Sequence, residues 1–332
     1  MKKLSRMAAV LIALVMIFSL TSCKLITKTE KGENKTVVAK ANGKKLTKGE
    51  YNRQLAIQKV YLGSYYGYDF FEGESGASYL SYIRSGVLDQ MVYRQVIEDK
   101  AKEFGLMDDT DTITQEAQKK LDEFIDSLSN KDGFNGALEK YNITKDDFLD
   151  LFEYDVVYQR VYDKITKDIS VTDDDVKKYY DENPYEFTEK DNTMNLSHIL
   201  VATEAEAKAA KERVEKGESF EDVAKAVSTD TQTAQNGGSL GDVNYVNSGL
   251  VQEFTDAAIK LKEGEISEPV KTTYGYHIIK CNSKTEFPVK AFDDVKDSIK
   301  EKLLSEKKDN EFNNNYDAWK KVANVKTYSD RI

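Results

Sequence analysis

The sequence predicts a small α+β unit inserted between helical segments that together form a mainly α-helical domain. Three observations predict this class. Apolar residues recur at three- and four-residue spacing through residues 83–168 and again through residues 291–322. At Thr193 this period changes, and short strand patterns then alternate with short helical ones. The chain's 332 residues correspond to about two domains, at roughly 100–200 residues each.

The composition excludes several classes of function. With 40% hydrophobic and 32% charged residues, the chain is globular in character. A formal net charge of −10 argues against nucleic acid as a partner, because phosphate binding needs clustered Lys and Arg. Two Cys and two His argue against a structural zinc module, because a Cys₄ site cannot form within one chain and a Cys₂His₂ site would need an unusual pairing of all four residues. Glycine-rich nucleotide-binding motifs are not found either, so we expect neither a metal nor a cofactor.

The N-terminal residues form an export signal. Three basic side chains within residues 1–6 precede the apolar run Met7–Leu20, which is shorter than the ~20 residues of a membrane-spanning helix. The following Leu20-Thr21-Ser22-Cys23 resembles a bacterial lipobox. This resemblance implies that residues 1–22 are a lipoprotein signal peptide and that Cys23 carries the lipid. The alternative is an ordinary export signal followed by an unmodified cysteine.

We therefore expect the protein on the extracytoplasmic face of the bacterial cell membrane, held there by its lipid. The polar residues 23–36 are predicted to be a flexible tether. With Cys23 lipidated, Cys281 is the one remaining thiol, so no disulfide can form within the chain.

The helical domain begins with a hairpin. Residues 37–46 predict two short strands joined by a turn at Asn42-Gly43. Thr47 and Glu50 then form a capping box that opens a helix. Further helices are expected at residues 83–97, 114–127, 144–161, 171–183 and 291–322.

One segment of the helical domain is rich in both aromatic residues and glycine. Residues 61–82 contain eight Tyr or Phe side chains and four glycines, and we expect a loop or irregular insertion because glycine breaks helices. Its role stays open between two interpretations. The aromatic side chains either fill the core between helices or form an exposed surface that binds unfolded polypeptide.

The α+β unit contains both histidines of the chain. His198 lies in the predicted strand 194–201 and His277 in the predicted strand 274–281. A strand histidine is usually a satisfied core residue, but two on one small sheet favour a shared hydrogen-bonded site. The remaining elements expected here are helices at 204–216, 219–227 and 250–260, a glycine-rich turn at 236–241 and a strand at 269–272.

Ordered motifs across this unit resemble a parvulin-type peptidyl-prolyl cis–trans isomerase. The resemblance implies a four-stranded antiparallel-type sheet with surrounding helices, and catalytic roles for His198, Asp230 and His277. It places Leu250, Phe254 and Tyr274 in substrate binding. Ser239 departs from the family, which often has Asp there. The motifs are S-H-I-L-V (197–201), S-F-E-D-V-A (219–224), S-T-D (228–230), G-G-S-L-G (237–241), F-T-D-A-A (254–258), G-E-I-S-E-P-V (264–270) and T-Y-G-Y-H-I-I (273–279).

The flanking segments are similar to helical foldase lipoproteins of the PrsA/SurA type, in which V-V-A-K-A-N-G-K-K-L-T-K-G-E-Y (37–51) is a usual opening. This similarity implies an N-terminal helical chaperone domain at 37–189. A parvulin domain follows at 190–285, and a C-terminal helix within 286–332 completes the chaperone domain. Whether the chaperone domain forms a homodimer stays open.

Together these expectations predict a membrane-anchored foldase that isomerises Xaa–Pro bonds and assists the folding of exported polypeptides. Rotation about an Xaa–Pro bond breaks no covalent bond, so the site needs no nucleophile. The alternative is a holdase chaperone whose parvulin domain binds without catalysis. A solute-binding lipoprotein would need two α/β lobes across a hinge, and the α+β unit is too short for that.

Overall fold

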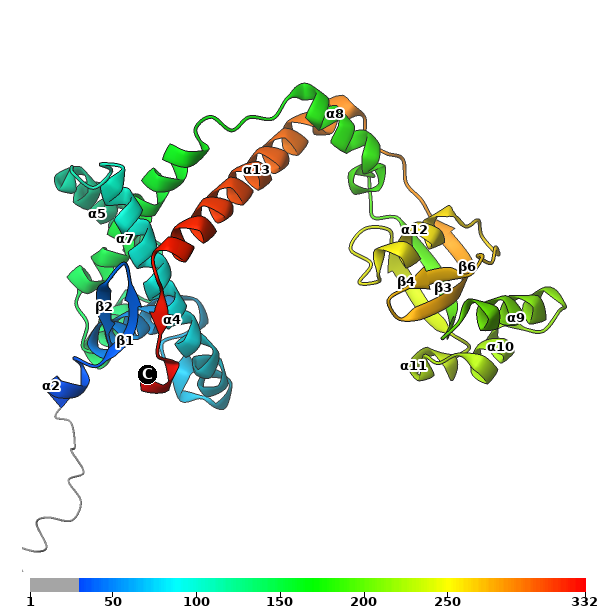
Figure 1. Cartoon of the computed structure of the whole chain (residues 1–332), viewed down its shortest axis with the longest axis horizontal. Coiled ribbons are helices and arrows are strands. Elements are labelled where there is room, and N and C mark those ends of the chain that lie inside the picture. The colour runs from blue at the N-terminus through cyan, green and yellow to red at the C-terminus, as the bar shows by residue number, and fades with distance from the viewer. Residues whose placement is uncertain (1–29) are drawn as a thin grey trace, which may run out of the picture. The chain divides into compact units, whose positions relative to one another are not determined.

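The computed structural model describes residues 30–332, which divide into two compact units (Figure 1). The first unit holds the described residues up to Asp168 together with Lys308–Ile332, and the second holds Ile169–Lys307. Among these described residues, no helix is long and apolar enough to cross a membrane.

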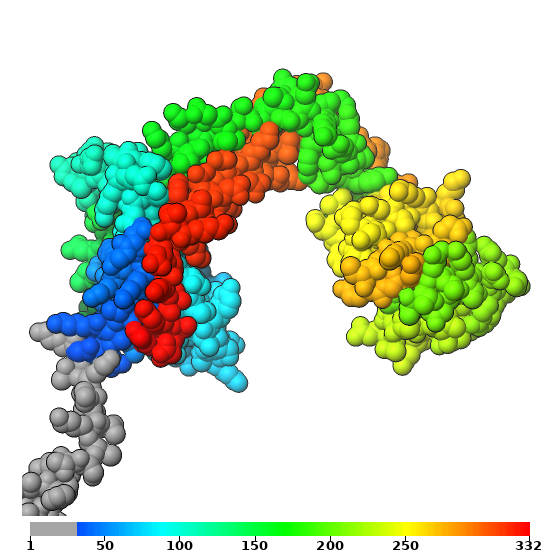
Figure 2. All heavy atoms as spheres, in the orientation of Figure 1, coloured from blue at the N-terminus to red at the C-terminus, as the bar shows by residue number. Residues whose placement is uncertain are grey.

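A three-stranded antiparallel sheet joins the two ends of the first unit. Strand β1 (Val37–Ala41) pairs with β2 (Lys44–Thr47) on one side and with β7 (Lys326–Thr327) on the other. Figure 2 shows the two ends of the unit side by side at the surface. The Asn42-Gly43 turn has φ of 49° and 77°, the left-handed values that a tight hairpin turn requires.

The rest of the first unit is helical, and threonine side chains begin two of its main helices. Thr47 and Thr144 each form a capping box, with Glu50 and Asp147 as their partners, so these helices begin where the sequence predicts. The helices are α2 (Glu30–Glu33), α3 (Lys48–Tyr66), η1 (Phe70–Glu72), α4 (Glu74–Glu103), α5 (Thr110–Ser127), α6 (Lys131–Lys140), α7 (Lys145–Thr166), the C-terminal part of α13 (Phe292–Val322) and η3 (Ser329–Arg331).

The prediction of a loop over residues 61–82 is wrong, because α3 and α4 run through most of this segment. The glycines permit close packing between its helices. A Cβ on Gly63 would lie 2.7 Å from the ring of Tyr68, and one on Gly76 would lie 1.9 Å from the carbonyl oxygen of Phe70. Both glycines are therefore needed where the connection between α3 and α4, residues 67–73, packs against these helices.

The end of α13 supplies core side chains to the first unit. Phe312 and Trp319 pack against Val96 and Ile97 of α4 and against Val157 of α7. Residues that lie more than 130 positions apart in the chain therefore share one apolar cluster, and the C-terminal helix belongs to the core of this unit.

The second unit contains the four-stranded antiparallel sheet implied by the resemblance, with strand order β4-β3-β6-β5. This confirms the predicted fold class. Its elements are α8 (Asp173–Glu182), η2 (Pro184–Phe187), β3 (Thr193–Val201), α9 (Glu204–Glu215), α10 (Phe220–Val227), α11 (Thr231–Ala234), β4 (Ser239–Asn244), α12 (Gln252–Lys260), β5 (Val270–Thr272) and β6 (Gly275–Thr285), followed by the first part of α13.

The two faces of this sheet carry different helices, because side chains alternate along a strand. Met194 and Leu196 of β3 and Ile279 of β6 pack against α12. Ile199 of β3 and Ile278 of β6 pack against α9 and α10 on the opposite face. The same alternation places His198 and His277 on the face that α12 covers, as Figure 1 shows for the strands and the helix.

Candidate active site

The two histidines meet on the face of the sheet beneath α12. His198 lies opposite Ile279 and His277 lies opposite Leu200 in the pairing of β3 with β6, so the histidines are diagonal neighbours. Their rings are stacked at 19° with centroids 5.3 Å apart, and the two Nδ1 atoms are 3.1 Å apart. Both side chains are buried, with 6% and 5% of the residue exposed.

Asp230 lies at the other end of the His198 ring. Its Oδ2 is 2.8 Å from Nε2 of His198 and accepts a 2.7 Å hydrogen bond from the Thr233 hydroxyl. Asp230 is also the N-cap of α11, and its Oδ1 accepts from the Gln232 backbone N–H. These contacts hold the carboxylate in one orientation toward the histidine.

Hydrogen bonds extend this network beyond His277. A carboxylate can only accept, so His198 donates from Nε2 to Asp230. With both rings neutral, His198 then accepts at Nδ1 from Nδ1–H of His277. Nε2 of His277 accepts from the Thr272 hydroxyl 2.9 Å away, and that hydroxyl accepts from the Tyr274 backbone N–H. Every ring nitrogen thus has a partner without any positive charge on either imidazole.

Phe254 of α12 covers the histidine pair. Its ring meets His198 edge to face at 5.8 Å and 77°, and meets His277 at 5.2 Å and 85°. Only 2% of Phe254 is exposed. The polar network and its apolar cover are therefore one packed assembly, in which the aromatic ring excludes water from the imidazoles.

The charges of the site follow from this burial. Loss of hydration and, to a smaller extent, the neighbouring His198 lower the pKa of His277 from 6.5 to about 4, and Asp230 opposes this change. Burial alone would raise the pKa of Asp230. The hydrogen bonds from Thr233 and His198 outweigh that effect and hold this pKa below its usual range. At neutral pH, His277 is therefore neutral and Asp230 is ionised.

The glycine-rich turn supports the backbone of His198. The backbone N–H of His198 donates to the carbonyl oxygen of Gly238 at 2.8 Å. Gly238 has φ of +77°, and a Cβ there would lie 2.1 Å from the carbonyl oxygen of His198. This close approach requires glycine at position 238 and ties the turn to the site.

Comparison with known proteins identifies the chain. A PPIC-type PPIase domain matches residues 196–283, and a SurA-like N-terminal domain matches residues 1–138. The foldase protein PrsA of Clostridium botulinum strain Langeland is 38% identical over 336 residues, which cover 100% of both chains. The foldase protein PrsA of Clostridium kluyveri is 40% identical over 339 residues, with 98% of each chain covered.

The chain belongs to the PrsA foldase family. This confirms the predicted resemblance, and the matching domain is that of the expected enzyme class, the peptidyl-prolyl cis–trans isomerases. Two solved structures are also similar. The peptidylprolyl isomerase PrsA from Bacillus cereus is 27% identical, covers 90% of this chain and 96% of its own, and has a TM-score of 0.39. NmPin, the parvulin of Nitrosopumilus maritimus, is 44% identical, covers 27% of this chain and 95% of its own, and has a TM-score of 0.26.

In this PrsA-family chain, the remaining predicted site residues lie at different distances from the network. Leu250 packs against the same apolar cluster as Phe254, but it also lines a neighbouring cavity. Tyr274 is 72% exposed and reaches the network only through its backbone N–H. Cys23 lies outside the described residues. The roles of all these residues, and those of the network itself, stay predictions.

Two threonines of the network were missed by the sequence reasoning. Thr233 lies one helical turn after Asp230, and Thr272 lies five residues before His277 across the hairpin of β5 and β6. The spacing from Asp230 to Thr233 was a usable signal, because residues three apart share one face of a helical turn. Nothing in the sequence pattern distinguished Thr272 from Thr273.

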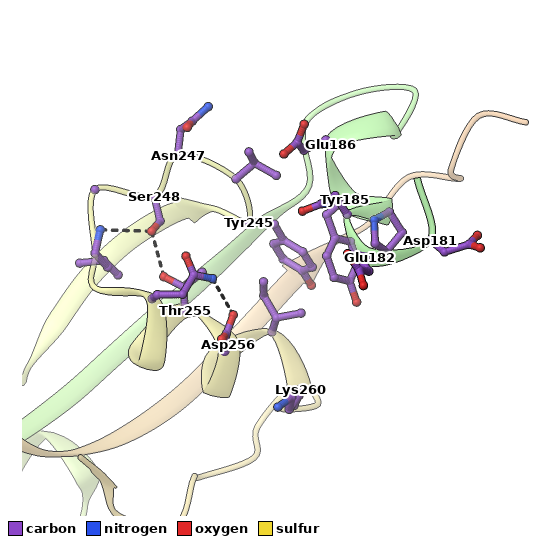
Figure 3. A pocket seen from close by; sticks show the side chains of 17 residues that line it. Asp181, Glu182, Tyr185, Glu186, Tyr245, Asn247, Ser248, Thr255, Asp256 and Lys260 are labelled. Carbon is purple, nitrogen blue, oxygen red and sulfur yellow. Dashed lines mark hydrogen bonds between the residues drawn. The ribbon is translucent and has the colours of Figure 1, made fainter. Parts of the chain in front are cut away.

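The described residues contain no cluster of three or more His, Cys, Asp or Glu side chains that could hold a metal ion. They do contain a cavity of about 780 Å³ beside the histidine site (Figure 3). Leu250 is part of its lining. Neither histidine lines this cavity. It is therefore a feature distinct from the hydrogen-bonded network.

Proposed function

We propose that this protein is an extracytoplasmic foldase that catalyses cis–trans isomerisation of Xaa–Pro bonds in exported polypeptides. The observation that carries the proposal is the buried network of Asp230, His198 and His277 with Phe254 packed edge to face on both imidazoles. A water-poor polar network that holds one carboxylate in place under an aromatic cover suits a reaction that rotates a bond and transfers no group.

The barrier to this rotation is about 18–20 kcal/mol, because twisting the amide destroys its resonance. Resonance places negative charge on the carbonyl oxygen, and the twisted amide loses that charge. A site therefore accelerates rotation by binding the twisted state better than the planar state. Phe254 would hold the proline ring, and the low dielectric around it would disfavour the more dipolar planar form.

Asp230 would act on the carbonyl oxygen. Its side chain is 24% exposed, whereas that of His198 is 7% exposed, so the carboxylate is the part of the network that an incoming peptide can approach. A fixed negative charge beside the carbonyl oxygen disfavours the planar amide, in which that oxygen is most negative. The two histidines and two threonines would keep the carboxylate in place.

Exchange spectroscopy by NMR on a short Xaa–Pro peptide tests the proposal directly. We expect catalytic amounts of the full chain to accelerate cis–trans exchange, and Asp230→Ala to remove most of that acceleration. Val289→Ser is the control, because Val289 is a 40% exposed residue outside the network. A folded wild-type chain that leaves the exchange rate unchanged would favour the holdase alternative.

A second activity, the holding of unfolded polypeptide, is supported by the helical unit. Tyr65, Tyr66 and Tyr82 are 66%, 60% and 74% exposed. Ring contacts of 5.2–6.3 Å connect Tyr66 and Tyr82 through Phe70 and Tyr79 into one exposed aromatic surface. Exposed, clustered aromatic side chains mark binding surfaces for apolar polypeptide segments.

Binding of a proline-free peptide rich in apolar residues separates this activity from isomerisation. The combined variant Tyr65→Ser, Tyr66→Ser and Tyr82→Ser is expected to weaken binding, as measured by calorimetry, without changing Xaa–Pro exchange of a short peptide. Val322→Ser is the matched control, since Val322 is 75% exposed on the same unit. Equal peptide binding by the triple variant and the wild type would remove the aromatic surface from the proposal.

A further inference from the structure

The cavity beside the histidine site has two walls. One wall consists of the end of α8 and η2, residues 181–186, and the other of the loop 245–250 with the exposed side of α12 (Figure 3). Its volume of about 780 Å³ lies within the usual range of ligand sites, roughly 300–1,000 Å³.

Direct contacts join these walls. The rings of Tyr185 and Tyr245 meet edge to face at 5.1 Å. Behind them, the segment after η2 pairs with the segment after β6, with a 3.0 Å hydrogen bond from the backbone N–H of Glu189 to the carbonyl oxygen of Pro288. The Tyr245 hydroxyl also donates to Glu286 at 2.6 Å. The cavity is therefore bounded by packed, hydrogen-bonded elements.

The cavity and the proposed site adjoin the same helix, α12. Phe254 points from this helix to the histidines, while the next residue, Thr255, and Ile259 one turn later line the cavity. Leu250, just before the helix, lines the cavity and packs on the apolar cluster that contains Phe254. A polypeptide in the cavity would therefore contact Leu250, which also packs on the apolar cluster that contains Phe254.

The lining has the mixed chemistry that a polypeptide needs. Tyr185 and Ile259 offer apolar surface, and the side chain of Asn247 offers both a donor and an acceptor. Ser248 holds the loop in place by hydrogen bonds to the Thr255 hydroxyl and the backbone N–H of Leu250, which Figure 3 shows as dashed lines. A peptide backbone presents one donor and one acceptor at each residue, and its side chains would fill the apolar part.

We propose that this cavity binds the part of the substrate polypeptide that flanks the target proline. The inference rests on the proposed function, because it assigns the cavity to the same substrate chain. Its contacts lie away from the rotating bond, so they hold the planar and twisted states equally. Such contacts lower KM and leave kcat unchanged.

Two peptides with the same central Xaa–Pro bond test this proposal. One has about four residues, and the other has about six residues on each side of the proline, which reach roughly 20 Å when extended. The extensions consist of neutral and basic residues, because the carboxylates of Asp181, Glu182 and Asp256 line the cavity. NMR exchange measurements over a range of peptide concentrations give KM and kcat for each peptide.

The full wild-type chain is expected to show a lower KM for the long peptide than for the short one. Asn247→Gly removes the amide at a position with φ of 56° without introducing strain, and Tyr185→Ser removes one ring of the wall. Each variant should raise the KM for the long peptide about fivefold, because the loss of one typical interface contact weakens binding by roughly that factor. The kcat for both peptides and the KM for the short peptide should stay constant. Val289→Ser is the matched control. Val289 is as exposed as Tyr185, at 40% against 39%, but it does not line the cavity.

Equal KM values for both peptides in the wild type, or an unchanged long-peptide KM in Asn247→Gly, would overturn the proposal. Failure of the proposed function gives a different result, namely no turnover of either peptide by a folded chain. In that case calorimetric binding of the long peptide still tests the cavity. Weaker binding to Asn247→Gly than to Val289→Ser would support the cavity as a polypeptide site, and equal binding would refute it.

Discussion

His198 and His277 are separated by 79 positions in the sequence, yet their Nδ1 atoms lie 3.1 Å apart beneath the ring of Phe254. Two adjacent cationic imidazoles would repel each other at this distance in a buried place. The pair therefore disfavours a positive charge on His277, whose lowered pKa follows from burial and from its neighbour.

Stability should fall as the pH drops below the usual histidine pKa. In the unfolded chain His277 binds a proton near pH 6.5, whereas in the folded chain its pKa is about 4. Between these values the unfolded state binds more protons, so the free energy of unfolding decreases as the pH falls, by on the order of 3 kcal/mol in all. Urea unfolding at a series of pH values measures this loss. The variant His277→Gln should show a shallower dependence, and an equal slope in both chains would contradict the assignment.

Asp230→Ala should lower kcat more than it changes KM, because the apolar cluster around Phe254 remains while the negative charge of the carboxylate is lost. The substitution also removes an acceptor of the His198 Nε2–H, and the loss of such a partner costs roughly 1–3 kcal/mol of folding stability. NMR exchange kinetics provide the measurement. Asp230→Asn separates the two effects, since it keeps an acceptor but removes the charge. Unchanged kcat in both folded variants would place catalysis elsewhere.

Phe254→Ala should reduce both stability and catalytic efficiency. The side chain is 2% exposed and packs on both histidines, and loss of such a ring costs about 3–5 kcal/mol. Thermal unfolding and exchange kinetics are measured on the same sample, so that activity is compared only where the chain is folded. Phe254→Leu, which keeps most of the apolar volume, should recover more stability than activity. Full activity in folded Phe254→Ala would show that this ring does not hold the proline of the substrate.

The predicted domain division has its own test. Residues 190–285 should fold alone and catalyse exchange, since Asp230, His198 and His277 all lie within this segment. Removal of residues 286–332 should destabilise the N-terminal helices, because it deletes the buried side chains Phe312 and Trp319.

Hydrogen exchange of α4 and α7 amides reports that destabilisation, and Val322→Ser in the intact chain is the control for a surface change. Undiminished protection of these helices in the shortened chain would contradict the predicted completion of the helical domain by its C-terminal helix.

Cys23→Ala should abolish lipid anchoring. If Cys23 carries two acyl chains, the unmodified chain should partition into a detergent-rich phase and the variant should stay in the aqueous phase. Cys281→Ser is the matched control, because Cys281 is the other thiol of the chain and is fully buried. The same partitioning for Cys23→Ala and the unmodified chain would rule out the lipobox interpretation.

The sequence by itself determined the local elements and the family. Thr47 and Thr144 each begin a helix at the predicted residue, and Thr172 begins one a single residue after the predicted start, because a capping box depends only on residues three positions apart. The alternation along β3 and β6 likewise placed His198 and His277 within strands. Ordered motifs across residues 197–279 then indicated the isomerase domain, and the family match over residues 196–283 confirms it.

Only the tertiary structure decided which residues meet. Thr272 completes the His277 hydrogen bonds, whereas Tyr274 points into solvent, because the hairpin of β5 and β6 turns between them. Such contacts depend on the relative positions of several elements, and no local pattern in the chain encodes them.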